Sequence, residues 1–167
     1  NLSFPKQVAM GFLAGAFTAI GGSLAIVVGR GSPELMKANP GLAKFVFGAV
    51  FPVGLMLVII TGAELFTGNT AVILPACLSK AARWKGLFRN WVVVYLSNFA
   101  GSILVALFLA YWSGMINVNS ADAFSKLLGT EAAKIATAKT TIGWWQVFLR
   151  GIGCNWLVCR AVGMALA

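Results

Sequence analysis

The chain has 167 residues, of which 59% are hydrophobic and only 10% charged, whereas an ordinary soluble domain carries roughly 25% charged residues. This composition excludes an ordinary soluble domain and indicates an integral membrane protein. The 13 basic and four acidic residues give a net charge of +9. The basic residues lie between apolar runs rather than on a polar face with interleaved aromatics, which argues against nucleic-acid binding and favours contact with anionic headgroups of the lipid bilayer.

Four apolar segments are long enough to cross a hydrocarbon core of about 30 Å, which takes about 20 helical residues. They span roughly residues 7–29, 42–79, 86–113 and 142–167. We therefore expect a single all-α transmembrane domain over residues 1–167. Small or polar side chains in the first and third segments, Gly11, Gly15, Asn98 and Gly101, are expected to let these helices pack closely.

The connectors between these segments differ in charge. Residues 80–89 carry Lys80, Arg83, Lys85 and Arg89 without an acidic residue. Residues 114–139 form the one stretch of soluble character, where the Ser-Ala-Asp-Ala run at 120–123, followed by Lys-Leu-Leu, predicts a capped surface helix. Because basic connectors stay on the cytoplasmic side, we expect the N-terminus inside, the 114–139 loop outside, and a location in the cell (inner) membrane.

The second apolar segment is nearly twice the length of a straight span, and residues 62–70 interrupt it with polar side chains. A broken helix explains both features, since non-helical backbone at membrane depth occurs only where protein or a water-filled cavity satisfies its polar groups. The end of a half-helix at the membrane midplane favours an anion. We expect Asn69 or Thr70 to cap the second half-helix.

Several residues near this break are candidates for contact with a substrate. We expect Thr67 to touch it, since a hydroxyl can donate to an anion or accept from a neutral acid. Glu64 is expected to support the amides of the loop, because a carboxylate facing an anion would repel it. Leu65 and Phe66 are expected to form a dry constriction. Lys139 is either a snorkelling interfacial lysine or a cation that concentrates anions at a pore mouth.

The side chains that usually support catalysis or metal binding are scarce. The sequence contains no histidine, and its three cysteines lack the spacing of a zinc site. We expect Cys77, Cys154 and Cys159 to be buried, reduced thiols. No nucleophile and base pair is apparent, so we expect no enzyme activity, no metal and no cofactor.

Four stretches of this chain resemble the formate/nitrite transporter family, and they follow one another in the family's order. They are Gly62-Ala-Glu-Leu-Phe-Thr-Gly-Asn-Thr70; Asn90-Trp91 with Asn98-Phe-Ala-Gly101; Ala138-Lys139-Thr140; and Phe148-Leu-Arg-Gly-Ile-Gly-Cys-Asn-Trp-Leu-Val-Cys159. The resemblance implies an aquaporin-like bundle of six spans in two inverted repeats, assembled as a homopentamer with one pore in each protomer. This chain would supply the first four spans.

The resemblance also implies roles for individual residues. Thr67, Lys139 and Asn155 would line the substrate pathway, and Gly68 and Asn69 would support the loop together with Glu64. The apolar residues would form two constrictions, with Leu65, Phe66 and Val158 at the cytoplasmic one and Phe51 and Leu55 at the outer one. The family's central histidine lies in its fifth span, so we expect a chain truncated or only partly described at its C-terminus.

These features predict a channel or transporter for a small monovalent anion, formate or nitrite, which passes together with a proton. Desolvation in a dry constriction favours the neutral acid, whereas a cation at the mouth attracts the anion. Transport of hydrosulfide or lactate by the same fold remains an alternative. A membrane anchor or assembly subunit without transport is another, although it leaves the polar break in the second segment unexplained.

Overall fold

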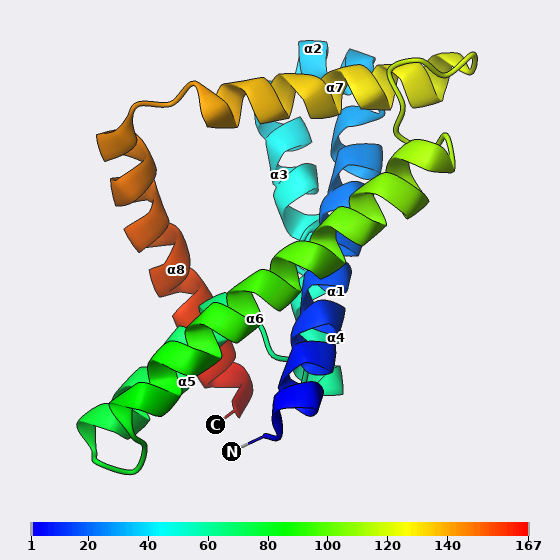
Figure 1. Ribbon diagram of the computed structural model, residues 1–167. Helices are drawn as coiled ribbons and strands as arrows, with labels where there is room; N and C mark the ends of the chain where they lie inside the picture. Colours follow the sequence, from blue (N-terminus) through cyan, green and yellow to red (C-terminus); the bar gives the residue numbers. More distant parts are fainter. Residues whose placement is uncertain (1, 167) are drawn as a thin grey trace. The chain divides into compact units, whose positions relative to one another are not determined.

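A computed structural model describes residues 2–166, and its regular structure over these residues is entirely helical (Figure 1). The helices, in chain order, are α1 (Phe4–Arg30), α2 (Pro33–Ala38), α3 (Pro40–Val50), α4 (Val53–Thr61), α5 (Phe66–Leu78), α6 (Trp84–Leu104), its π-helical continuation η1 (Val105–Trp112), α7 (Ala123–Thr140) and α8 (Trp144–Leu166).

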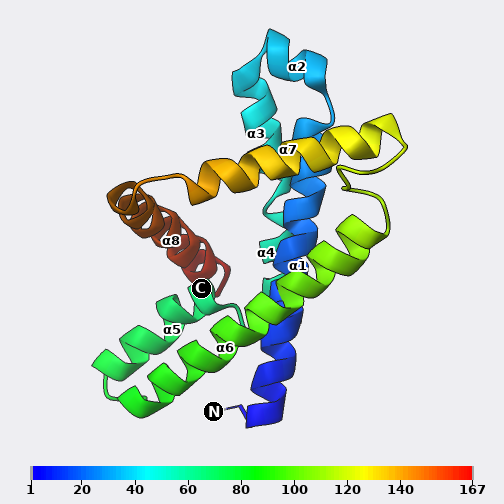
Figure 2. The same cartoon turned by 45° about the horizontal axis from the view of Figure 1, so that its top comes forward.

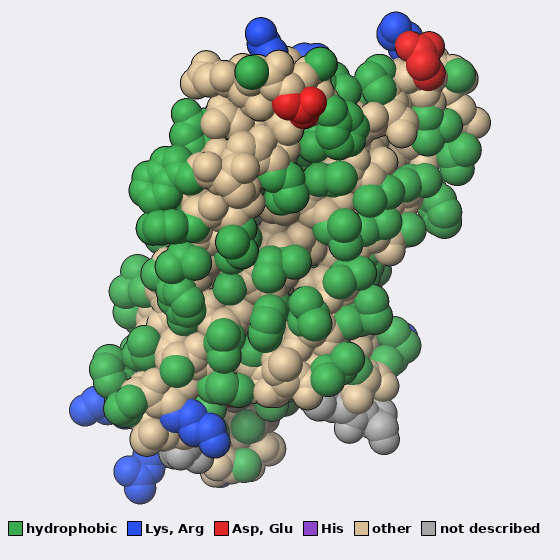
Figure 3. Space-filling view, turned by 90° about the vertical axis from the view of Figure 1, so that its right-hand side faces the viewer, with side chains coloured by type: hydrophobic (Ala, Val, Ile, Leu, Met, Phe, Trp, Pro, Cys, Tyr) green, Lys and Arg blue, Asp and Glu red, His purple; other side chains and the backbone are tan. Residues whose placement is uncertain are grey.

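Four stretches of helix are long and apolar enough to cross a membrane. They are Phe4–Arg30, Pro40–Thr61, Trp84–Trp112 and Trp144–Ala165. Hydrophobic side chains cover much of the surface in view (Figure 3), as is expected where lipid rather than water is the solvent. The prediction of an all-α membrane protein with four spans is confirmed.

The second apolar segment contains two interruptions rather than the single break expected from the sequence. The first is a turn at Phe51 and Pro52, because proline has no N–H to donate within the helix. The second follows Thr61, where Gly62 adopts a positive φ of 65° that glycine tolerates best. The expectation that Asn69 or Thr70 caps α5 is wrong, since the helix begins at Phe66 and its N-cap residue, Leu65, makes no side-chain cap bond.

The described helices divide into two compact units, and each is considered by itself. The first consists of Asn1–Gly15, Val58–Gly101 and Ile142–Ala167. Within it α5 and α6 lie side by side, joined by a short connector (Figures 1 and 2), and α5 packs against α8. Gly11 and Gly15 of α1 face Ser97 and Asn98 of α6 without room for a larger side chain, which confirms the predicted close packing.

The second unit consists of Ala16–Leu57 and Ser102–Thr141. Figure 2 shows its helices α2 and α3 as a hairpin. The Asp122 carboxylate accepts from the Ser125 N–H at 2.8 Å and caps α7, within the run at 120–123 where a capped helix was predicted. This bond from the Ser125 backbone lowers the pKa of Asp122 below its ordinary value of 3.8.

The buried face of α7 is held by both apolar packing and charge. Leu128 is 1% exposed and forms a small core with Ala110 and Ile116. The buried Glu131 carboxylate lies 2.7 Å from the Lys134 amine and 3.8 Å from the Arg30 guanidinium. α7 is therefore a packed helix rather than a free surface loop.

Candidate functional site

The break between α4 and α5 keeps its backbone polar groups paired. The Gly62 and Ala63 N–H groups donate back to Ile59 and Val58, at 3.2 and 3.0 Å. The Glu64 N–H donates to the carbonyl of Met10 on α1, at 3.2 Å. These bonds make a non-helical turn tolerable within an apolar environment.

Asn98 of α6 ties this loop to two other elements through a single side chain. Its Oδ1 accepts from the Phe66 N–H at 3.0 Å, where α5 begins. Its Nδ2 donates to the carbonyls of Gly11 at 2.7 Å and Glu64 at 2.9 Å. Asn98 therefore takes the place of the side-chain N-cap that α5 lacks.

Sequence reasoning assigned Asn98 to helix packing and missed this role. The available signal was an amide side chain in the middle of an apolar span, which needs partners for its donors and its acceptor. The partners lie 32 and 87 positions away in sequence, so spacing alone could not identify them.

The Glu64 carboxylate accepts hydrogen bonds from two side-chain amides, one of them in the 62–70 segment that it was expected to support. Its Oε2 accepts from Asn69 Nδ2 at 2.6 Å and from Asn90 Nδ2 at 3.3 Å. The same Asn69 Nδ2 lies 3.0 Å from Asn90 Oδ1, which closes the network between the loop, α5 and α6. Charge-assisted bonds of this kind hold the carboxylate in place within the protein.

A second polar cluster joins α5 to α8. Asn155 Nδ2 donates to Thr70 Oγ1 at 3.1 Å and approaches Cys159 Sγ at 3.6 Å. Thr70 Oγ1 in turn donates to the carbonyl of Thr67 at 2.7 Å. The buried Asn155 Oδ1 has no hydrogen-bond partner among residues 2–166. Thr67 and Asn155 are thus linked through Thr70, and the Asn155 carbonyl oxygen remains free to accept a hydrogen bond.

The apolar residues near the loop have well-defined neighbours. The Phe66 ring packs edge-to-face against Tyr95 and Trp91 of α6, at centroid distances of 5.5 and 6.1 Å. Gly68 is buried, and a Cβ built there would lie 3.6 Å from Val162 Cγ2 of α8. Gly68 therefore lies against α8, at a distance where a Cβ would make ordinary van der Waals contact. Val158, one turn before Val162, is half-buried.

Three predicted site residues belong to the other unit. Phe51 and Lys139 are exposed there, and Leu55 is half-buried. Lys139 lies in the last turn of α7. The outer constriction of Phe51 and Leu55, and the place of Lys139 at a pore mouth, stay predictions.

The cysteines agree only partly with the expectation of buried thiols. All three are free, but Cys77 alone is fully buried, whereas Cys159 is half-buried and Cys154 is exposed. Among residues 2–166, no group of three histidine, cysteine, aspartate or glutamate side chains could hold a metal ion.

Comparisons with known proteins identify the family. The family model described as formate/nitrite transporter matches residues 1–167. A probable formate transporter of Methanothermobacter thermautotrophicus is 47% identical over 97% of this chain and 61% of that protein. The formate channel BtFdhC of Bacillus thuringiensis is 36% identical over 98% of this chain and 59% of its own.

Two further matches are a nitrite transporter and a solved formate channel. The nitrite transporter NirC of Escherichia coli K12 is 33% identical over 92% of this chain and 52% of that protein. A solved pentameric formate channel with formate bound superimposes with a TM-score of 0.82 and 30% identity, over 98% of this chain and 60% of that one.

The chain spans between 52% and 61% of the length of these relatives. It thus carries a partial fold of that kind, with four candidate spans. These matches are to transporters and not to enzymes. The chain belongs to the formate/nitrite transporter family.

Proposed function

We propose that the complete protein passes formate or nitrite across a membrane along a path that borders Thr67 and Asn155. The observation that carries this proposal is the unused polar capacity between α5 and α8. The buried Asn155 Oδ1 has no partner among the described residues, and the Thr67 carbonyl is linked to Asn155 through Thr70. Buried polar atoms are rarely left unpaired without a functional reason.

The chemistry of these groups suits a small weak acid in both of its forms. The Thr67 hydroxyl can donate to a carboxylate or nitrite oxygen, and the Asn155 carbonyl oxygen can accept from the O–H of the protonated acid. A desolvated path favours the neutral form, because burial penalises charge. We propose that the anion is attracted by Lys139 and crosses the narrowest part together with a proton.

The assembly and orientation are part of the same proposal. The structural relative is a pentameric channel, and we propose a homopentamer for the complete protein as well. The connector that holds Lys80, Arg83, Lys85 and Arg89 would face the cytoplasm, with the N-terminus on the same side and α7 outside. The membrane would be the cell (inner) membrane.

Two alternatives remain, transport of a different substrate and a membrane anchor without transport. Hydrosulfide or lactate would use the same path, and their selection would depend on its width. A membrane anchor would need neither the broken span nor the Thr67 hydroxyl. Removing that hydroxyl therefore separates transport from anchoring.

Substituting Thr67→Val in the full-length protein is expected to reduce formate and nitrite flux about tenfold, because a hydrogen bond to a charged group contributes about 1.5–3 kcal/mol. Threonine and valine have the same shape, so the pentamer should still assemble.

A second substitution, Lys139→Gln, is expected to reduce flux most strongly at low ionic strength, where attraction by an exposed cation has the longest range. Uptake into proteoliposomes measures the flux of each variant, and size-exclusion chromatography measures whether the pentamer assembles.

Thr130→Val on α7 is the matched control, since Thr130 is exposed and its hydroxyl, among residues 2–166, donates to the Lys126 carbonyl of the same helix. It should leave flux unchanged. A Thr67→Val protein that assembles and transports at the wild-type rate would rule out the path described here.

A further inference from the structure

The connector between α5 and α6, together with the first turns of α6, gathers positive charge that no ion pair within residues 2–166 neutralises. Lys80, Arg83, Lys85 and Arg89 are all exposed. The sequence contains no aspartate or glutamate from residue 65 to residue 121. The ion pairs found within residues 2–166 involve other cations, namely Arg30, Lys37 and Lys134.

The first turns of α6 arrange these charges beside an aromatic surface. At about 100° per residue, Trp84 and Phe88 share one stripe of the helix, and Lys85 and Arg89 share the next. Trp84 is 50% exposed and Phe88 60% exposed, whereas Leu87, on the side of the helix opposite Lys85 and Arg89, is 1% exposed. The helix therefore presents adjoining aromatic and cationic stripes to its surroundings.

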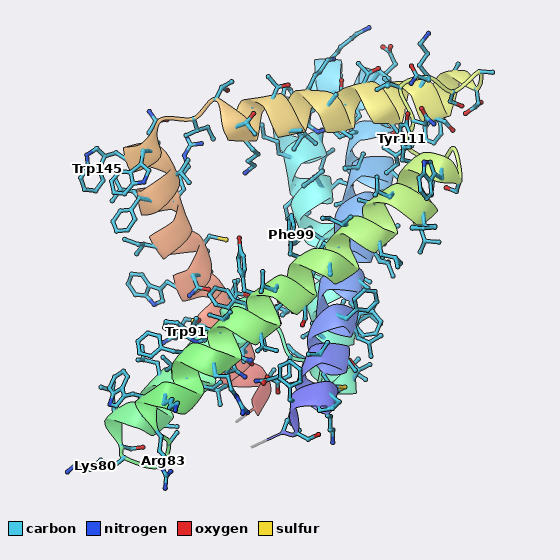
Figure 4. All side chains as sticks on the ribbon, viewed as in Figure 1. Lys80, Arg83, Trp91, Phe99, Tyr111 and Trp145 are labelled. Atoms are coloured by element: carbon cyan, nitrogen blue, oxygen red, sulfur yellow. The ribbon has the colours of Figure 1, made fainter. Side chains whose placement is uncertain are left out.

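The backbone of the connector places a lysine where glycine would be easier to accommodate. Lys80 has a φ of 62°, in the left-handed region, which is unfavourable for any residue that carries a Cβ. Its N–H donates to the Cys77 carbonyl at 3.1 Å, and the Ala82 N–H donates to the Ala76 carbonyl at 2.9 Å. These bonds pair two carbonyls at the C-terminal end of α5. Figure 4 shows Lys80 and Arg83 together at this end of the α5–α6 pair, whereas Trp91 lies farther along α6.

We infer that this surface, formed by Lys80, Arg83, Lys85 and Arg89 with Trp84 and Phe88, binds the headgroups of anionic phospholipids. Arginine and lysine are the side chains that bind phosphate oxygens, and arginine can do so with two parallel bonds. Tryptophan is enriched at the level of lipid headgroups. The adjoining stripes match an anionic lipid, whose phosphate lies beside its own acyl chains.

The aromatic stripe distinguishes this partner from other polyanions. An acidic protein or a nucleic acid would contact the cations from water and leave Trp84 and Phe88 without an apolar partner. A phospholipid covers both stripes at once. This inference depends on membrane insertion alone, and not on the proposed transport.

The test is lipid binding to the full-length protein in neutral detergent, followed by native mass spectrometry with added phosphatidylglycerol or phosphatidylcholine. Wild-type protein is expected to retain phosphatidylglycerol in preference to phosphatidylcholine. The double substitution Arg83→Gln and Lys85→Gln is expected to weaken phosphatidylglycerol binding about thirtyfold, since each cation near an anionic surface contributes about 1 kcal/mol. The control Lys44→Gln with Lys126→Gln removes the same charge from exposed positions elsewhere and should bind as wild type does.

Lys80→Gly separates lipid binding from folding. It removes one cation and also relieves the left-handed backbone, so phosphatidylglycerol affinity should fall about fivefold while the thermal unfolding temperature in phosphatidylcholine stays the same or rises. Equal affinity for the two lipids, or equal losses in the test and control variants, would overturn the inference. Displacement of the lipid by millimolar inorganic phosphate would also overturn it, because the surface would then be a site for free phosphate.

Discussion

Replacing Asn98 by leucine is expected to produce the largest loss of stability of any polar substitution in the chain, about 2–6 kcal/mol. The apolar side chain leaves the Phe66 N–H and the Glu64 carbonyl without their partners. Each unsatisfied buried group costs about 1–3 kcal/mol. We expect the full-length protein to unfold at a lower temperature in detergent and to lose its flux, because the loop is no longer fixed at the start of α5.

Asn119→Leu serves as the control for this change. Asn119 is exposed, and its side chain makes one long bond of 3.5 Å to the Tyr111 hydroxyl. Its substitution should shift the unfolding temperature little. An Asn98→Leu protein as stable as the Asn119→Leu protein would show that the loop does not depend on the α6 side chain.

Gly15→Ala is expected to have the second large effect, by forcing α1 away from α6. A Cβ on Gly15 would collide with the backbone carbonyl of Asn98. Backbone cannot rotate aside as a side chain can, so the cost should reach the upper part of the range of about 1–3 kcal/mol for overpacking. The displacement would also pull the Gly11 carbonyl from the Asn98 amide, which now lies 2.7 Å from it.

The matched substitution is Gly48→Ala in α3, where an added Cβ meets no atom within 4 Å. In a helix interior alanine is favoured over glycine by about 0.5–1 kcal/mol, so this variant should be neutral or more stable. Differential scanning fluorimetry of the two proteins in the same detergent gives the comparison. Equal unfolding temperatures for the two alanine variants would contradict the close contact between α1 and α6.

The spans could be predicted from sequence because a hydrocarbon core constrains both length and composition. The first segment has no long polar interruption, so a helix was predicted over residues 7–29. This range lies within α1, Phe4–Arg30. The break after Thr61 could be predicted for the same reason, since polar residues at membrane depth need hydrogen-bond partners within the protein. The family resemblance, on the Gly62–Thr70 loop and the segment ending at Cys159, is confirmed by the comparisons.

The interactions that hold the loop could not be predicted, because they join residues far apart in the chain. The capping rules point to Asn69 or Thr70 from local sequence alone, yet the acceptor at the start of α5 is Asn98 Oδ1, 32 residues away. Glu64 was expected to support the amides of the loop, and its partners include the side-chain amide of Asn90 on α6, 26 residues away, as well as that of Asn69. Long-range partners of buried polar groups are decided by helix packing, which a single sequence does not specify.

The most direct test of anion passage is stopped-flow swelling of liposomes that contain the full-length protein. Under inward gradients of formate or nitrite at pH 7.5, these liposomes should swell faster than protein-free liposomes, and an equal gradient of gluconate should give no such difference. If a proton accompanies the anion, the protein-dependent rate should rise as the pH falls to 5.5. Swelling rates equal to those of protein-free liposomes with both anions, at every pH, would contradict the proposed function.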